Sequence, residues 1–114
     1  MIAVNQEKIN KEYIDEWYAN WEILSSKLYI AHSERLKSEA FKLMEVGIAA
    51  YEALLLQSAM DNATVEDDFE LYPINGRERL TFIKARPAQF ASYRQLDELY
   101  KETKKRAARL RLKK

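Results

Sequence analysis

Cysteine is absent from the 114 residues of this chain, and histidine and glycine are scarce. Without cysteine, the chain forms neither disulfide bonds nor thiolate metal sites. The only histidine is His32, whereas a zinc site built without cysteine needs several. The two glycines, Gly47 and Gly76, lie far apart, and a phosphate-binding loop needs them close together. We therefore predict a protein that is not an enzyme and that has no metal, no cofactor and no catalytic residue.

A cluster of acidic residues is the main candidate for a metal site or for catalysis by carboxylates. Glu66, Asp67, Asp68 and Glu70 follow one another closely. A calcium loop, however, needs alternating oxygen ligands, a glycine at the bend and a distant glutamate. Because this segment lacks that glycine and that spacing, we favour an acidic surface loop over a metal site or carboxylate catalysis.

Long apolar runs are also missing. The longest extends from Val46 to Leu56 and is interrupted by Glu52, whereas a membrane-spanning helix needs about 20 apolar residues. The first residues show no basic segment followed by an apolar one, which a secretory signal would have. We therefore expect a cytoplasmic protein with no membrane partner.

The scarcity of glycine and proline, with two of each, favours a mainly α fold. Hydrophobic residues make up 47% of the chain, enough for a buried core in a single domain over residues 1–114. We divide this domain into an acidic, aromatic-rich helical part (5–61), a β-hairpin (69–84) and a basic C-terminal helix (87–112). The expected order, helix-helix-β-hairpin-helix, describes a small three-helix domain.

Residues 5–60 contain no proline, and their apolar residues recur at steps of three and four, which predicts helices with one buried face. We expect a break around His32 and Ser33, with Ser33 capping a second helix that begins at Glu34. One continuous helix, about 84 Å long, is the alternative and would suit an elongated helical dimer. The first stripe comprises Ile14, Trp17, Trp21, Leu24, Leu28 and Ala31, and the second comprises Leu36, Leu43, Gly47 and Leu54.

Two short segments on either side of Asn75 and Gly76 alternate in polarity and predict the β-hairpin. The Asn-Gly pair readily adopts the positive φ angles of a type I′ turn. With that turn, Leu71 and Leu80 face each other on one side of the hairpin. An irregular loop is the alternative.

Pro87 predicts the start of the last helix, because proline is tolerated in the first helical turn. Within this helix, an inner apolar stripe and an outer basic row separate at 100° per residue. The inner stripe comprises Tyr93, Leu96, Tyr100, Thr103, Ala107 and Leu110, and the outer row comprises Arg94, Lys101, Lys105 and Arg109.

Charge is distributed unevenly along the chain. Residues 1–61 carry six Lys or Arg and ten Asp or Glu, a net charge of −4. Residues 62–114 carry thirteen and eight, a net charge of +5, and the two halves sum to the overall +1. Cations in a row on one helix face can bind phosphates without reading sequence, although basic residues in a last turn also complement the helix dipole. We predict that nucleic acid contacts Arg94, Lys101, Lys104, Lys105 and Arg109, together with Arg77 and Arg79 of the hairpin.

The chain is therefore predicted to associate with nucleic acid or with nucleic-acid-handling machinery. The alternative is a protein-protein interaction adaptor, regulatory subunit or inhibitor that acts through its helical surface or docks an acidic protein surface. Aromatic residues are enriched at interfaces, although burial within the chain is the commoner arrangement for a helical stripe. We assign the protein interface of an expected homodimer to Tyr13, Trp17, Trp21 and Leu24.

Overall fold

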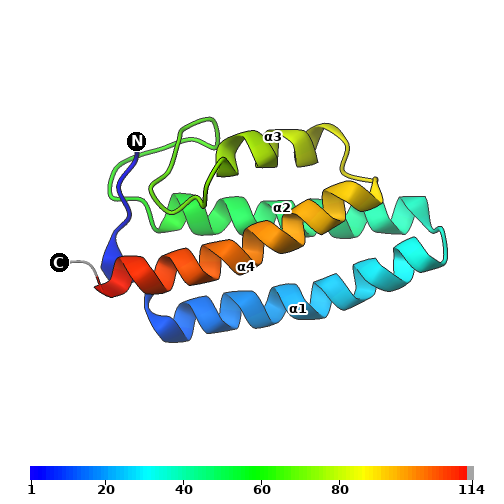
Figure 1. Cartoon of the computed structure of the whole chain (residues 1–114), viewed down its shortest axis with the longest axis horizontal. Coiled ribbons are helices and arrows are strands. Elements are labelled where there is room, and N and C mark those ends of the chain that lie inside the picture. Colours follow the sequence, from blue (N-terminus) through cyan, green and yellow to red (C-terminus); the bar gives the residue numbers. More distant parts are fainter. Residues whose placement is uncertain (113–114) are drawn as a thin grey trace.

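The computed structural model describes residues 1–112, and these residues confirm the mainly helical fold class (Figure 1). Over this range the chain forms four α-helices, one short 3-10 helix and no β-strand. Two isolated β-bridges join Ile2 to Phe69 and Val4 to Ala59. The elements are η1 (Gln6–Ile9), α1 (Lys11–Ser33), α2 (Lys37–Gln57), α3 (Gly76–Ala85) and α4 (Phe90–Leu112). Lys113 and Lys114, part of the basic C-terminal segment, lie outside the described residues.

The helices pack side by side with their axes along the long dimension of the molecule (Figure 1). α1 and α2 form an antiparallel pair, α4 packs against both, and α3 packs against α4. The N-terminal segment runs beside the loop between α2 and α3, where the Ile2 N–H donates to the Asp68 carbonyl (2.8 Å) and the Met60 N–H donates to the Ala3 carbonyl (2.9 Å). The N-terminal segment and the last turn of α4 lie at the same end of the bundle (Figure 1).

An aromatic stack holds α1 and α4 together. The Tyr100 ring lies 4.5 Å from the Trp17 ring and 4.2 Å from the Trp21 ring, measured between centroids. The Tyr100 hydroxyl donates to the Gly47 carbonyl (2.7 Å), which links the stack to α2. Gly47 is needed at this crossing, because a Cβ there would lie 2.7 Å from Trp21 Cζ3. The buried polar atoms of the stack are thus satisfied, as burial requires.

The predicted break between two helices is confirmed, but the predicted cap is wrong. α1 ends at Ser33 and α2 begins at Lys37, so the break follows directly after the expected position. The Ser33 hydroxyl donates back to the Tyr29 carbonyl (2.8 Å) and caps nothing. The turn depends instead on Arg35, whose φ of 58° is left-handed.

The predicted β-hairpin over 69–84 is wrong. Residues 76–85 form α3, and Leu80 and Ile83, one helical turn apart, supply its buried face. A type I′ turn needs positive φ at both central residues. Asn75 has a φ of 55°, but Gly76 does not have a positive φ and begins the helix. In the segment before it, Phe69 forms the β-bridge to Ile2, and residues 70–74 follow as turns and a bend.

The last helix begins three residues later than predicted. Pro87 lies in a turn, and α4 starts at Phe90. The inner stripe of this helix is confirmed, because all six of its predicted members are buried. Among residues 1–112, no helix combines the length and the apolar character that crossing a bilayer requires.

Candidate functional site

The predicted basic row on α4 is exposed along its whole length. Arg94, Lys101, Lys105 and Arg109 all lie on the solvent side of the helix. Arg94 stands 6.0 Å from the centre of the Phe90 ring, near the start of α4. The four cations therefore lie on one exposed face, as their spacing predicted. Their ability to bind an anion depends on which of them already form ion pairs within the chain.

Two lysines of the predicted site are paired within the chain. Lys101 lies 2.9 Å from the Asp97 carboxylate, and this hydrogen bond raises the pKa of Lys101. Lys104 lies 4.5 Å from the centre of the Tyr18 ring and 3.9 Å from Asp15 of α1. Each positive charge is therefore partly balanced before any partner arrives.

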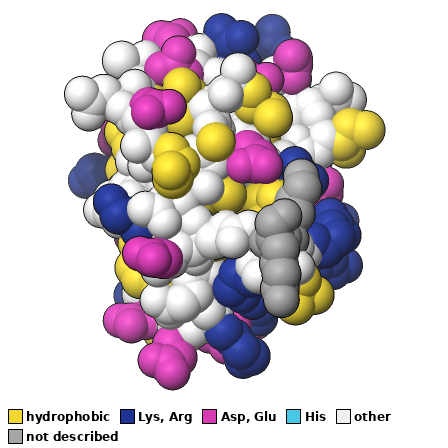
Figure 2. All heavy atoms as spheres, turned by 90° about the vertical axis from the view of Figure 1, so that its left-hand side faces the viewer, with side chains coloured by type: hydrophobic (Ala, Val, Ile, Leu, Met, Phe, Trp, Pro, Cys, Tyr) yellow, Lys and Arg dark blue, Asp and Glu magenta, His cyan; other side chains and the backbone are white. Residues whose placement is uncertain are grey.

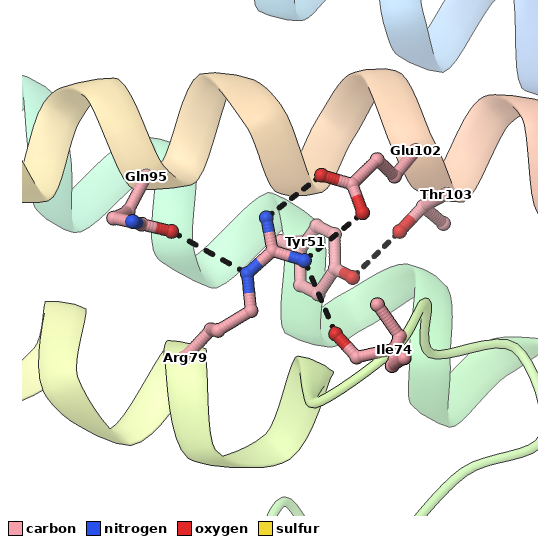
Figure 3. Close-up of polar contacts among 6 residues, drawn as sticks. All are labelled: Tyr51, Ile74, Arg79, Gln95, Glu102 and Thr103. Atoms are coloured by element: carbon pink, nitrogen blue, oxygen red, sulfur yellow. Dashed lines mark hydrogen bonds and ion pairs between the residues drawn. The ribbon is translucent and has the colours of Figure 1, made fainter.

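Arg79 is fully engaged between α3 and α4 (Figure 3). Its guanidinium donates to both carboxylate oxygens of Glu102, at 3.0 and 2.8 Å, and to the Ile74 carbonyl at 3.2 Å. Its Nε–H donates to the Gln95 side chain at 3.4 Å. The bidentate pair raises the pKa of Arg79 and lowers that of Glu102. Arg79 thus fastens α3 to α4, while Arg77 stays exposed on α3.

A hollow of about 480 Å³ lies beside the last turns of α4. We call it the cationic hollow. Lys105 and Arg109 border it and make no hydrogen bond or ion pair with another described residue, and Arg106 donates its Nε–H to the Glu70 carbonyl (2.9 Å). Figure 2 shows several basic side chains gathered in the lower and right-hand parts of this end of the molecule. The remaining lining residues are Tyr72, Pro73, Ile74 and Glu102.

Sequence reasoning missed Arg106 and the wall opposite it. Arg106 belongs to the visible basic run 104–106, but it lies beside the predicted row and is half-buried. The wall of residues 72–74 was assigned to a strand, so its place beside α4 was unpredictable. Tyr72, which could have stacked on a base, is 7% exposed, and burial raises its pKa to about 12.

The residues predicted for a protein interface occupy two environments. Trp17 and Trp21 lie in the core, 9% and 2% exposed, and Leu24 is half-buried. Tyr13 is 38% exposed and its hydroxyl donates to the Gln57 side chain (2.6 Å). The two indoles therefore pack inside the core and are not available to a partner. Of the four residues, only Tyr13 is exposed to solvent.

His32 and Asp67 of the acidic cluster make contacts within the fold. His32 packs against Phe90 and Tyr93, and burial lowers its pKa. Asp67 of the acidic cluster accepts the Thr64 N–H (2.8 Å) in a turn. Within residues 1–112, no three His, Asp or Glu side chains are arranged to share a metal ion.

A family comparison covers nearly the whole chain. Residues 11–114 match a protein family described as YpoC-like protein. The chain belongs to the YpoC-like family. The matched range includes α1 to α4 and therefore the cationic hollow. Comparison with curated proteins found no match, and comparison with solved structures found none either. The description of the YpoC-like family names neither a ligand nor a reaction, so a function has to be inferred from geometry.

Proposed function

We propose that this member of the YpoC-like family is a non-enzymatic binding protein that associates with nucleic acid through the basic end of α4. One observation carries the proposal: Lys105 and Arg109 lie one turn apart on an exposed helix face and form no hydrogen bond or ion pair with another residue among 1–112. The Glu102 carboxylate, whose pKa is lowered by Arg79 and in part by Lys105, is already held by Arg79 and forms no ion pair with these two cations. Arg106 stands beside them. Cations left unpaired in this way attract phosphates and release counterions when they bind them.

The shape of the bundle limits how nucleic acid binds. α4 is flanked by α1 and α3, and the described bundle measures 47 × 27 × 20 Å. The exposed side chains at the basic end of α4 are those of Lys105 and Arg109, and lysine and arginine contact phosphates without reading the base sequence. Binding therefore uses the phosphate backbone and has no sequence preference.

A charge-reversal experiment tests this function. Lys105→Glu with Arg109→Glu should abolish binding of a fluorescent oligonucleotide of mixed sequence in an anisotropy titration. Lys37→Glu with Lys42→Glu, two exposed cations on α2, gives the same change of net charge and should retain most of the binding. With about three phosphate charges neutralised by Lys105, Arg106 and Arg109, the logarithm of the binding constant should fall against the logarithm of salt concentration with a slope of about −2 for a single strand. Equal losses in the two variants would mean that only overall charge matters.

A protein-binding adaptor, regulatory subunit or inhibitor is the second candidate function. It is favoured by large apolar side chains that stay exposed on α1 and α2, among them Ile23 (60%), Tyr29 (60%) and Val46 (58%). Under this function, oligonucleotides do not bind, and the variant of Lys105 and Arg109 behaves like the control. The homodimer and the cytoplasmic location remain predictions.

A further inference from the structure

The cationic hollow concentrates its charge at one point. Lys105, Arg106 and Arg109 all come from little more than one turn of α4, and Lys105 and Arg109 are separated by a rise of about 6 Å. The hydrogen bond from Arg106 Nε to the Glu70 carbonyl fixes the plane of that guanidinium. The Glu102 carboxylate also borders the hollow, but Arg79 holds both of its oxygens. The hollow therefore presents a net positive charge that suits one compact anion.

Carboxylates surround this point on two sides. Toward the start of α4, the exposed Glu98 follows Asp97, which already neutralises Lys101. On the side of α3, a neighbouring hollow that shares Arg106 is lined by three acidic residues, Asp68, Glu70 and Glu78, and by one further cation, Arg77. A polyanion that continued in either direction would meet more carboxylates than further cations, and like charges oppose binding. The surface therefore favours an anion that ends in the hollow over one that passes through it.

We propose that the cationic hollow binds the terminal phosphate of a nucleic-acid strand, an inference that rests on the nucleic-acid function proposed above. A phosphate monoester carries a charge of about −1.5 to −2 at pH 7 and three strong acceptor oxygens, whereas a phosphodiester within the strand carries a single charge. The three cations that line the hollow should therefore bind the monoester more tightly than a phosphodiester. Ile74, 78% exposed, borders the same hollow and offers an apolar surface to the terminal sugar.

The test compares strands that differ only at their ends. The probes are one fluorescent single-stranded oligonucleotide with a phosphate at its 5′ end, the same strand with a phosphate at its 3′ end, and the strand with neither. The wild-type protein should bind at least one phosphorylated strand about tenfold more tightly than the unphosphorylated one. Lys105→Gln with Arg109→Gln should bring that ratio close to one, and Lys37→Gln with Lys42→Gln should preserve it.

The possible outcomes separate this inference from the proposed function. Equal binding of all three strands by the wild-type protein overturns the terminal-phosphate site and leaves nucleic-acid association standing. Failure of every strand to bind removes both. Adenosine monophosphate that binds as tightly as the phosphorylated strand would make the ligand a mononucleotide, and polyglutamate that competes equally would make it an acidic protein. Either result overturns the inference.

The pH dependence of the preference for a phosphorylated strand gives a second test. The second pKa of a phosphate monoester is about 6, so its charge falls as the pH is lowered through that value. The preference of the wild-type protein for the phosphorylated strand should therefore narrow between about pH 7 and about pH 5. A preference that stays constant over this range would contradict binding of the doubly charged phosphate.

Discussion

At the scale of single residues, the nearest partner decides what a cation does. Arg79 and Lys105 both belong to the basic half of the chain, and both were predicted to bind nucleic acid. Arg79 is bound by Glu102, Ile74 and Gln95 (Figure 3). Lys105, in contrast, is exposed and forms no ion pair among the described residues. Sequence spacing predicts the side of a helix on which a cation lies, but it does not predict this pairing.

Replacing Glu102 should therefore reduce stability more than replacing an unpaired glutamate. Glu102→Gln keeps the shape of the side chain and removes the charge that holds Arg79. Because both side chains are partly exposed, at 20% for Arg79 and 35% for Glu102, we expect a loss of about 1 kcal/mol in the free energy of unfolding at pH 7. Urea titration measures it, and Glu16→Gln, at an exposed glutamate of α1, is the control.

The sign of the pH dependence gives this prediction a second test. The bond to Arg79 lowers the pKa of Glu102 from its usual 4.5. The stabilisation is therefore complete above that value and is lost as the pH falls through the lower, folded-state pKa. The difference between the wild-type protein and Glu102→Gln should shrink in acid. A difference that persists unchanged in acid would show that the carboxylate charge is not its cause.

At the scale of elements, periodicity predicted the buried faces well and local turn signals predicted the boundaries poorly. The stripe on α4 was correct because burial against a core imposes the helical repeat directly on the sequence. The hairpin prediction from the Asn75-Gly76 pair was wrong because one left-handed residue can precede a helix as well as form part of a hairpin turn. Leu80 and Phe82 alternate as a strand would, but Leu80 pairs with Ile83 in the core, and Phe82 is 42% exposed.

The end of α1 was hard to place because it lacks the usual glycine. The Leu36 N–H donates to the Ala31 carbonyl (2.8 Å), and the Arg35 N–H donates to the His32 carbonyl (3.1 Å). These bonds form a Schellman motif, in which the left-handed residue is usually glycine. Here Arg35 occupies it with a φ of 58°.

Arg35→Gly should therefore stabilise the protein. The left-handed conformation costs a residue with a Cβ about 1–2 kcal/mol, and glycine gives back part of that gain through the greater freedom of the unfolded chain. We expect a net increase of about 0.5 kcal/mol in the free energy of unfolding, measured by urea titration. Arg86→Gly is the matched control, because Arg86 ends α3 with a φ of −141° and should only lose stability. A loss of stability in Arg35→Gly would rule out strain at this turn.

The candidate site was predictable only on the side that α4 supplies. Its exposed row followed from the spacing of Lys101, Lys105 and Arg109 along one helix. The facing wall of residues 72–74 depends on where α3 lies. Tertiary contacts hold α3 in place, namely its buried Leu80 and Ile83 and the Arg79–Glu102 pair. The concave shape of the site is thus a tertiary property.

At the scale of the whole molecule, folding brings the acidic and basic halves of the chain together. Lys104 of α4 approaches Asp15 of α1, and Lys84 of α3 lies 2.7 Å from Glu52 of α2. These ion pairs balance part of the charge difference between the two halves, and Lys105 and Arg109 stay exposed at the cationic hollow. The bundle itself depends on aromatic residues, because Tyr51 and Tyr100 lie at its centre with their hydroxyls bonded to Thr103 and Gly47.

These buried phenols should make the fold sensitive to alkali. Burial raises the pKa of Tyr51 and Tyr100 above the usual 10.0, and it raises that of Tyr72 to about 12. The unfolded chain therefore loses these protons first, so stability is retained below pH 10 and falls as the pH rises above it, by up to about 1.4 kcal/mol per pH unit for each phenol.

Urea titrations at increasing pH, with ultraviolet absorbance to follow the phenolate, measure this loss of stability. Tyr51→Phe should cost about 1 kcal/mol at pH 7, because it breaks the buried bond to Thr103. Its stability should then fall less steeply than that of the wild-type protein above pH 10, because one ionising group is gone. Tyr29→Phe, at a site that is 60% exposed, should leave both the stability and its slope unchanged. Equal slopes for the wild-type protein and Tyr51→Phe would show that Tyr51 ionises as readily in the folded chain as in the unfolded one, which is incompatible with a phenol sealed between α2 and α4.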